Sequence, residues 1–433
     1  MVKSGNKISA LTKAVKNFLQ LPATRRLEYY LLFLALLVRI VYVLNVDASF
    51  ALDPGDQKIY DSIAQSWLNS GAFMEGSSYR PPLYPLFLGS IYFVFGHKLL
   101  LVKLLQAVLG TISCVLTMAI SKRMFSRTTT LLAGAIVAFT PVLIHYTAQV
   151  LSETLFTTLL LLILFLLVSR AEALRYKDML LIGVLIGAAS LCRTNIALFP
   201  FAIFVWLKVM MKYSWKRTFS LTAFAICAAA IIIAPWTIRN YHVHNHFVLI
   251  STNGGINLWI GNNPHATGDW LTPREYYSPE GLTEYEIDKE YYREALQFIV
   301  QNPGTAVTLG VKKLKIFYSS YPHVFDQIPF YTVLLCAITG IFLTLRNPRS
   351  SLLLLTVLYF SVLSCFFFAN QRFHIPIIAL LAIYAAYGFI KIEQATAFIF
   401  TIGFKLMNRG KVLHNGKGRI RSTLHSCAKE KTV

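Results

Sequence analysis

Long apolar runs recur along the chain and alternate with short polar or basic segments. Many of them reach about 20 residues, the length needed to cross the hydrocarbon core of a bilayer. The pattern predicts ten membrane-spanning helices, at 27–44, 99–120, 129–148, 154–169, 178–192, 196–211, 218–236, 329–345, 350–368 and 375–393. A shorter apolar stretch at 395–407 is not a secure span and is assigned to the membrane interface.

The stretch 83–96 is also apolar, but a full crossing there would reverse every later loop and move the basic clusters outside. We therefore predict that it is a helix lying in the outer interface. Arg39, near the far end of the first span, is expected to reach the outer interface with its guanidinium group.

A long polar segment, 240–328, separates the seventh and eighth spans and is rich in tyrosine and glutamate. Turn residues flank a strand-like run at 256–260, a helix is predicted over 284–300, and Pro303 opens another helix. The segment is predicted to be a small external domain of mixed α/β structure.

Composition agrees with an all-α polytopic membrane protein. The chain has 433 residues, of which 55% are hydrophobic and 14% charged, and its mean hydropathy of +0.55 excludes a soluble enzyme. Its net charge of +21 gathers at both ends of the chain and in alternate short loops, as the positive-inside rule requires, so nucleic acid is excluded as a partner. Both termini are predicted to be cytoplasmic, and the first apolar run lacks a cleavage site and should stay as an anchor.

These boundaries divide the chain into five predicted parts. They are a basic cytoplasmic arm (1–26), a transmembrane module with its first external loop (27–239, loop 45–98), an external domain (240–328), C-terminal spans (329–394), and an interfacial segment with a basic tail (395–433).

The first external loop opens on an acidic turn in which Asp53 and Asp56 flank a Pro-Gly pair. A helix is predicted to follow, and aspartate is a residue type that caps helices. Two interpretations stay open: a carboxylate held near a substrate hydroxyl, or a solvated turn with a capping aspartate.

The predicted topology places several other charged residues at outer loops or outer helix ends. With the two aspartates they are Glu153, Arg193, Arg372 and His374. Arginine can grip a phosphate with its planar fork, and a carboxylate can take a proton from a hydroxyl. The set suits a lipid-borne anion that reacts with a hydroxyl, and Lys103, just inside the second span, could neutralise its phosphate.

Each of these residues also has a structural interpretation. Glu153 could simply favour the dipole at the start of a helix, and Arg193 could be an interfacial anchor. The alternating His242, His244 and His246 have no dependable metal-ligand spacing, so no metal site is predicted there. The chain has no Walker loop, GxGxxG or HExxH motif, so nothing supports ATP-driven transport or a metalloprotease.

Several short motifs together resemble glycosyltransferase family 39-like membrane proteins. This family includes dolichyl-phosphate-mannose protein mannosyltransferases and the aminoarabinose transferase that acts on lipid A. The motifs are Gly55-Asp56-x3-Tyr60-x3-Ala64, Arg80-Pro81-Pro82-Leu83-Tyr84-Pro85-Leu86, Ser152-Glu153-Thr154, Arg239-Asn240-Tyr241, Thr252-Asn253-Gly254-Gly255-x-Asn257-Leu258 with Gly261-Asn262-Asn263-Pro264, and Arg372-Phe373-x-x-Pro376.

The resemblance implies a GT-C fold and a polyprenyl-phosphate sugar donor. It makes Asp56 the candidate base and Glu153 the second catalytic acid. Many relatives have two adjacent acids in the first loop, whereas Gln57 follows Asp56 here, so the role of Asp53 and of any bridging divalent cation is left open. The candidates for substrate binding are Asp53, Tyr60, Arg80, Tyr84, Lys103, Arg193, Arg372 and His374.

The leading hypothesis is therefore a glycosyltransferase of the bacterial inner membrane. It would move a hexosyl or pentosyl group from a polyprenyl phosphate to a lipid, glycan or protein acceptor at the outer face. A transporter or lipid flippase could use the same charges, but it should place them at mid-membrane depth. A non-catalytic lipid-binding subunit with the same fold is the third hypothesis.

Overall fold

The computed structural model describes residues 22–47, 52, 55–71, 73–270, 281–321 and 324–401. Within these residues the chain is helical and forms no strand; an isolated bridge joins Asp269 and Ala369. An all-helical chain is what the spacing of the apolar runs predicts.

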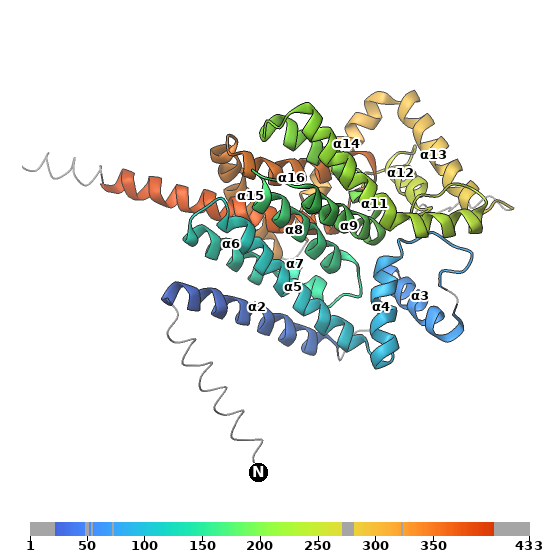
Figure 1. Ribbon diagram of the computed structural model, residues 1–433, viewed down its shortest axis with the longest axis horizontal. Helices are drawn as coiled ribbons and strands as arrows, with labels where there is room; N and C mark the ends of the chain where they lie inside the picture. The colour runs from blue at the N-terminus through green and yellow to red at the C-terminus, as the bar shows by residue number, and fades with distance from the viewer. Residues whose placement is uncertain are drawn as a thin grey trace, which may run out of the picture.

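Most helices follow one another after a few residues, and longer connections separate α3 from α4 and α12 from α13 (Figure 1). The helices are α2 (Ala23–Asp47), α3 (Asp56–Ser70), α4 (Leu83–Phe95), α5 (Leu99–Lys122), α6 (Arg127–Phe139), α7 (Pro141–Thr147), α8 (Glu153–Arg170), α9 (Tyr176–Cys192), η1 (Thr194–Ile196), α10 (Phe199–Val205), η2 (Trp206–Met210, a π-helix), α11 (Trp215–His244), α12 (Gly254–Gly261), α13 (Glu284–Gln301), α14 (Pro303–Phe317), α15 (Val324–Thr344), α16 (Pro348–Phe366), η3 (Gln371–His374) and a last helix over 375–401.

Seven helices of the described chain are long and apolar enough to cross a membrane, which makes the chain a multi-pass membrane protein. An eighth span exists if α6 and α7, which are bent by 55° where Pro141 begins α7, are counted as one. The predicted total of ten also requires α9, with 17 residues, and the apolar stretch Thr194–Met210 to cross. Both are shorter than the other spans, so ten spans stays a prediction.

Two helices are largely buried in the bundle: α8, whose leucines at positions 160, 161 and 164 are fully buried, and the last helix, in which residues 377–386 are at most 2% exposed. Beside α8, helices α9 and α11 pack backbone to backbone. A Cβ atom at Gly187 of α9 would lie 2.8 Å from the carbonyl oxygen of Ala229 in α11. Small residues permit such close approach between membrane helices, where packing replaces the hydrophobic effect.

The stretch predicted to lie in the interface is α4. Its 13 residues extend only about 20 Å, less than the hydrocarbon core. In Figure 1 it stands across the direction of α2 and α5, next to α3. The two short helices pack tightly, because a Cβ at Gly89 would lie 2.5 Å from a ring carbon of Trp67.

The polar segment after α11 differs from its prediction. The run at 256–260 is part of helix α12, not a strand. Ile256 and Ile260, four residues apart, both turn toward Tyr291 of α13 and Phe368, a spacing that fits one face of a helix. The two later helices are confirmed as α13 and α14, although α11 extends to His244, beyond the predicted end of its span.

Two other predictions need correction. Arg39 does not reach the outer interface: it is 1% exposed and donates to the carbonyl oxygens of Val137 and Ala138, at 3.0 Å each. The segment 395–401 is not a separate interfacial piece but continues the last helix, while 402–407 lies outside the described residues.

Candidate active site

Asp56 is the first residue of α3, and Gly55 occupies the N-cap position without a side-chain cap. The carboxylate of Asp56 therefore does not cap the helix, contrary to the capping interpretation of the sequence. Its side chain is 15% exposed and forms ion pairs with two arginines. Arg80, from the segment between α3 and α4, donates to Oδ1, and Arg372 of η3 donates to Oδ2 at 2.6 Å.

The two arginines determine the charge state of Asp56. Burial by itself would raise the pKa of the carboxyl group, but the guanidinium groups of Arg372 and Arg80 outweigh burial and hold the pKa below its usual range. Asp56 is therefore ionised at neutral pH and tightly paired.

Glu153 begins α8 and its side chain is fully buried. Its Oε1 lies 2.7 Å from Nη1 of Arg193, at the end of α9, and 3.0 Å from Nε of Arg372. Arg372 thus bridges both carboxylates, Asp56 through one nitrogen and Glu153 through another. Residues separated by up to 316 positions meet in one cluster, which we call the charged cluster: Asp56, Arg80, Glu153, Arg193 and Arg372.

The charged cluster retains binding capacity. Glu153 Oε1, Arg193 Nη1 and Arg372 Nε face one another as ion pairs, whereas Glu153 Oε2 is buried with neither a hydrogen bond nor an ion pair among the described residues. Buried polar atoms are normally hydrogen-bonded, so Oε2 can accept a hydrogen bond from a hydroxyl group. The side chains of Arg193 and Arg372, at 14% and 26% exposed, leave an approach from outside.

The remaining sequence candidates lie around the cluster or away from it. Tyr60 and Tyr84 are buried and pack edge to face at 4.9 Å, and Lys103 is buried in α5. His374 is buried on another side, where Nδ1 lies 2.6 Å from the carbonyl oxygen of Phe317 and the ring stacks on Phe330. Asp53 lies outside the described residues.

Sequence reasoning missed the residues that hold Arg80 in place. Arg239 of α11 donates to the carbonyl oxygen of Ser77 at 2.8 Å and to Ser78 Oγ at 2.9 Å. Glu284 of α13 accepts from the backbone N–H of Ser78, also at 2.8 Å. The motif that contains Arg239 was visible, but nothing in the sequence indicates that it contacts a loop 162 residues away.

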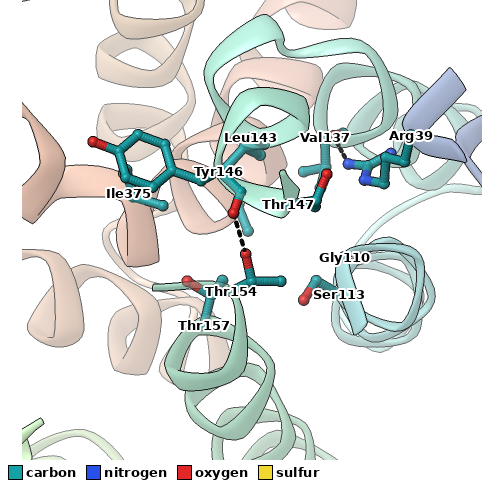
Figure 2. Close-up of a pocket in the computed structure, with 11 residues that line it drawn as sticks. Arg39, Gly110, Ser113, Val137, Leu143, Tyr146, Thr147, Thr154, Thr157 and Ile375 are labelled. Carbon is teal, nitrogen blue, oxygen red and sulfur yellow. Dashed lines mark hydrogen bonds between the residues drawn. The ribbon is translucent and has the colours of Figure 1, made fainter. Parts of the chain in front are cut away.

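A small cavity lies between α5, α7 and the start of α8 (Figure 2). It measures about 20 Å³ and is lined by Arg39, Tyr146, Thr154 and Thr157, among others, with Thr154 Oγ1 donating to the carbonyl oxygen of Tyr146 at 3.1 Å. A space of this size holds a single water molecule and no substrate. This cavity is therefore too small to be the substrate site.

The cluster does not fit a divalent cation well. No group of three or more His, Cys, Asp or Glu in the described residues could hold a metal. Moreover, Asp56 and Glu153 are each paired with two arginines, whose positive charge opposes a second cation. We therefore derive no step through a metal ion.

Comparison with known proteins supports a glycosyltransferase fold. Residues 79–238, which include Arg80, Glu153 and Arg193, match the family model described as dolichyl-phosphate-mannose-protein mannosyltransferase. A search of curated protein sequences gives no match.

Solved structures show the fold. The apo oligosaccharyltransferase of Archaeoglobus fulgidus matches with a TM-score of 0.54 and 12% identity, over 86% of this chain and 52% of that one. The same enzyme, AglB, in complex with an inhibitory peptide and a dolichol-phosphate matches with a TM-score of 0.54 and 14% identity, over 87% and 52%. This chain thus spans about half the length of the oligosaccharyltransferase.

ArnT from Cupriavidus metallidurans, bound to undecaprenyl phosphate, has 16% identity over 85% of this chain and 78% of that one, but its TM-score of 0.44 is too low to bear on the fold. The resemblance indicated by the motifs is nevertheless confirmed by the family match and the archaeal structures. Over residues 79–238 the sequence is similar to that mannosyltransferase family model, and over most of its length the chain has the fold of the archaeal oligosaccharyltransferase.

Proposed function

We propose that the chain transfers one sugar from a polyprenyl phosphate to a hydroxyl acceptor at the outer face of the membrane. The observation that carries this proposal is the bridging of Asp56 and Glu153 by Arg372. Three guanidinium groups against two carboxylates leave one positive charge in excess, which matches the single negative charge of a phosphodiester. AglB has been crystallised with a dolichol-phosphate, and the family model is named for a dolichyl-phosphate donor.

In the proposed reaction the acceptor oxygen attacks the anomeric carbon from the side opposite the lipid phosphate. The bond from the anomeric carbon to the phosphate oxygen breaks as the new glycosidic bond forms, and the configuration inverts. The acceptor's proton passes to Asp56, and the lipid phosphate leaves as an anion. Arg193 and Arg372 stabilise the charge that grows on the phosphate, and Lys103 is a further candidate for that role.

The ion pairs explain how Asp56 can be a base despite its low pKa. In the protein alone, Arg80 and Arg372 stabilise the carboxylate and make it a weak base. A donor phosphate that binds Arg372 competes with the carboxylate for this cation. Asp56 then becomes more basic when the donor is bound, which ties proton transfer to an occupied site.

The proposal includes the finer assignments made from the sequence. The site faces away from the cytosol, both termini are cytoplasmic, and the host membrane is a bacterial inner membrane. Segment 240–328 covers the site or selects the acceptor, and the hydrogen bond that Glu284 accepts from Ser78, in the loop that carries Arg80, supports this role.

The test uses purified protein, a panel of polyprenyl phosphates that carry different hexoses and pentoses, and an envelope extract as acceptor. We expect one donor to release free polyprenyl phosphate while the acceptor gains the mass of one sugar. A transporter reconstituted in proteoliposomes would move substrate and release no free polyprenyl phosphate. That result would replace the proposal with the transporter hypothesis.

A further inference from the structure

Three glutamines from separate parts of the chain meet beside the charged cluster. Gln57 of α3 donates from Nε2 to Oε1 of Gln149 at 2.7 Å, and its Oε1 accepts from the backbone N–H of Val150 at 3.1 Å. Gln57 and Gln149 are 7% and 8% exposed. Their side chains therefore join the start of α3 to segment 148–152, the connection between α7 and α8.

Gln106 of α5 holds the same connection from the other side. It is fully buried, and its Nε2 donates to the carbonyl oxygens of Gln149 at 2.7 Å and Thr147 at 3.1 Å. Its Oε1 accepts from the hydroxyl of Tyr84 at 2.8 Å. Buried hydrogen bonds of this kind fix backbone positions, since breaking one leaves a polar group unsatisfied.

The positions that these bonds join are adjacent to the two carboxylates. Gln57 directly follows Asp56, and segment 148–152 ends at Glu153. We infer that Gln57, Gln149 and Gln106, here called the glutamine clasp, position Asp56 relative to Glu153 so that Arg372 bridges both. This inference rests on the proposed function and adds positioning residues that do not touch the substrate.

The chemistry of the amide suits this task. An amide donates and accepts at once, so Gln57 satisfies Gln149 and Val150 together without adding charge. A glutamate at position 57 would add a third negative charge beside Asp56 and cancel the excess positive charge of the cluster.

The experiment compares Gln57→Met with Gln65→Met. Gln65 lies in the same helix and donates to Asp61 Oδ2 at 2.6 Å, so its variant loses a side-chain hydrogen bond outside the charged cluster. We expect Gln57→Met to lower kcat by about 10- to 100-fold, the cost of slight misplacement of catalytic groups, and to leave the donor KM unchanged. Gln65→Met should keep the kcat of the unmodified protein.

A second variant and a structural measurement guard against misfolding. Gln149→Met removes the bond between the two glutamines from the other side, and the double variant should lose no more activity than Gln57→Met alone, because that bond is already absent in Gln57→Met. Amide hydrogen exchange in peptides covering 148–152 should rise in Gln57→Met and not in Gln65→Met.

The outcomes separate the two claims. If the unmodified protein releases no polyprenyl phosphate from any donor, the proposed function fails and the role of the clasp in turnover fails with it. If it is active and Gln57→Met has the same kcat as Gln65→Met, only the clasp is overturned.

Discussion

Arg372 is the residue that makes one site out of two carboxylates. Its guanidinium group reaches Asp56 Oδ2 at 2.6 Å and Glu153 Oε1 at 3.0 Å, so the two acids share this cation, while Arg80 pairs with Asp56 and Arg193 with Glu153. Such sharing makes both carboxylates sensitive to any ligand that draws Arg372 away. In the proposed reaction, the basicity of Asp56 therefore depends on how strongly the donor phosphate competes with the two carboxylates for Arg372.

The first prediction concerns Asp56→Asn. The amide keeps the shape of the side chain but cannot accept the acceptor's proton, so turnover should fall by about 10²- to 10⁴-fold. Release of polyprenyl phosphate by the purified variant measures the loss. Asp61→Asn is the matched control, because Asp61 lies in the same helix and binds Tyr92 and Gln65 instead of the cluster. Near-normal turnover by a folded Asp56→Asn protein would remove Asp56 from its role.

The second prediction concerns pH. The pKa of Asp56 is depressed in the folded protein, so the stability that its ion pairs contribute is present above the unfolded pKa, about 3.9, and is lost as the pH falls through the folded pKa. Arg80→Gln removes one of the two cations and must raise the pKa of Asp56. The acidic limb of the profile of kcat/KM against pH should therefore move to higher pH.

Arg293→Gln is the control for this shift, since Arg293 pairs with Glu290 on the exposed face of α13. Its profile should match that of the unmodified protein. An acidic limb that stays in place in Arg80→Gln would show that another group governs it.

Sequence reasoning at this scale identified charged residues and missed neutral ones. Charges at outer helix ends are few in an apolar chain, so topology alone brought Glu153 and Arg193 to the same side. Gln57 and Gln149 carry no such signal, because glutamine is common on surfaces and their contact spans 92 residues. Only the fold shows that these amides are buried.

At the scale of elements, the break between α6 and α7 places the start of α8. Pro141 lacks a backbone N–H and interrupts the helical ladder, which frees carbonyl groups at the end of α6. Arg39 donates hydrogen bonds to two of these carbonyl groups. Farther along, the carbonyl oxygen of Tyr146 in α7 accepts a hydrogen bond from the hydroxyl of Thr154 in α8 (Figure 2). A buried cation in the first span thus supports the helix that carries Glu153.

The third prediction is that Arg39→Met destabilises the protein by about 1–3 kcal/mol, because it leaves buried carbonyl groups unsatisfied. Thermal unfolding in detergent measures the change. Arg127→Met is the comparison: Arg127 pairs with Glu28 at a partly exposed site, where a lost ion pair costs about 0–1 kcal/mol. Equal losses in the two variants would contradict the role assigned to Arg39.

The approximate bounds of the apolar helices could be predicted from the apolar runs of the sequence. The secondary structure of residues 256–260, in the polar segment after α11, could not. Ile256 and Ile260 lie in a run too short to separate period two from period four, and the flanking glycines favoured turns around a strand. The helix forms because that face packs on α13, and the backbone N–H of Gly255 donates to Asp288 at 2.7 Å. Such tertiary support cannot be read from eight residues.

At the scale of the whole molecule, the proposed function requires that the charged cluster and the α13–α14 hairpin share the outer side. The predicted side of the membrane on which each later loop lies depends on α4. If this 13-residue helix crossed the membrane, every loop that follows it would lie on the opposite side. The short length of α4 and its direction across α2 and α5 in Figure 1 favour the outer interface. The arrangement is open to direct measurement.

The fourth prediction tests this arrangement with single cysteines in a background whose native cysteines are replaced. Lys98→Cys, at the N-cap of α5 just after α4, and Gln297→Cys, on the exposed face of α13, should react with a membrane-impermeant maleimide in spheroplasts. Lys177→Cys, in the first turn of α9, should react only after the membrane is opened, because the positive-inside rule places its loop in the cytoplasm. If α4 crossed the membrane, position 98 would lie on the cytoplasmic side and would be protected from the reagent. Position 177 would then react in intact spheroplasts, and position 297 would react only after the membrane is opened. The charged cluster would then have to receive its donor from the cytoplasm, and an outer-face transferase could not be maintained.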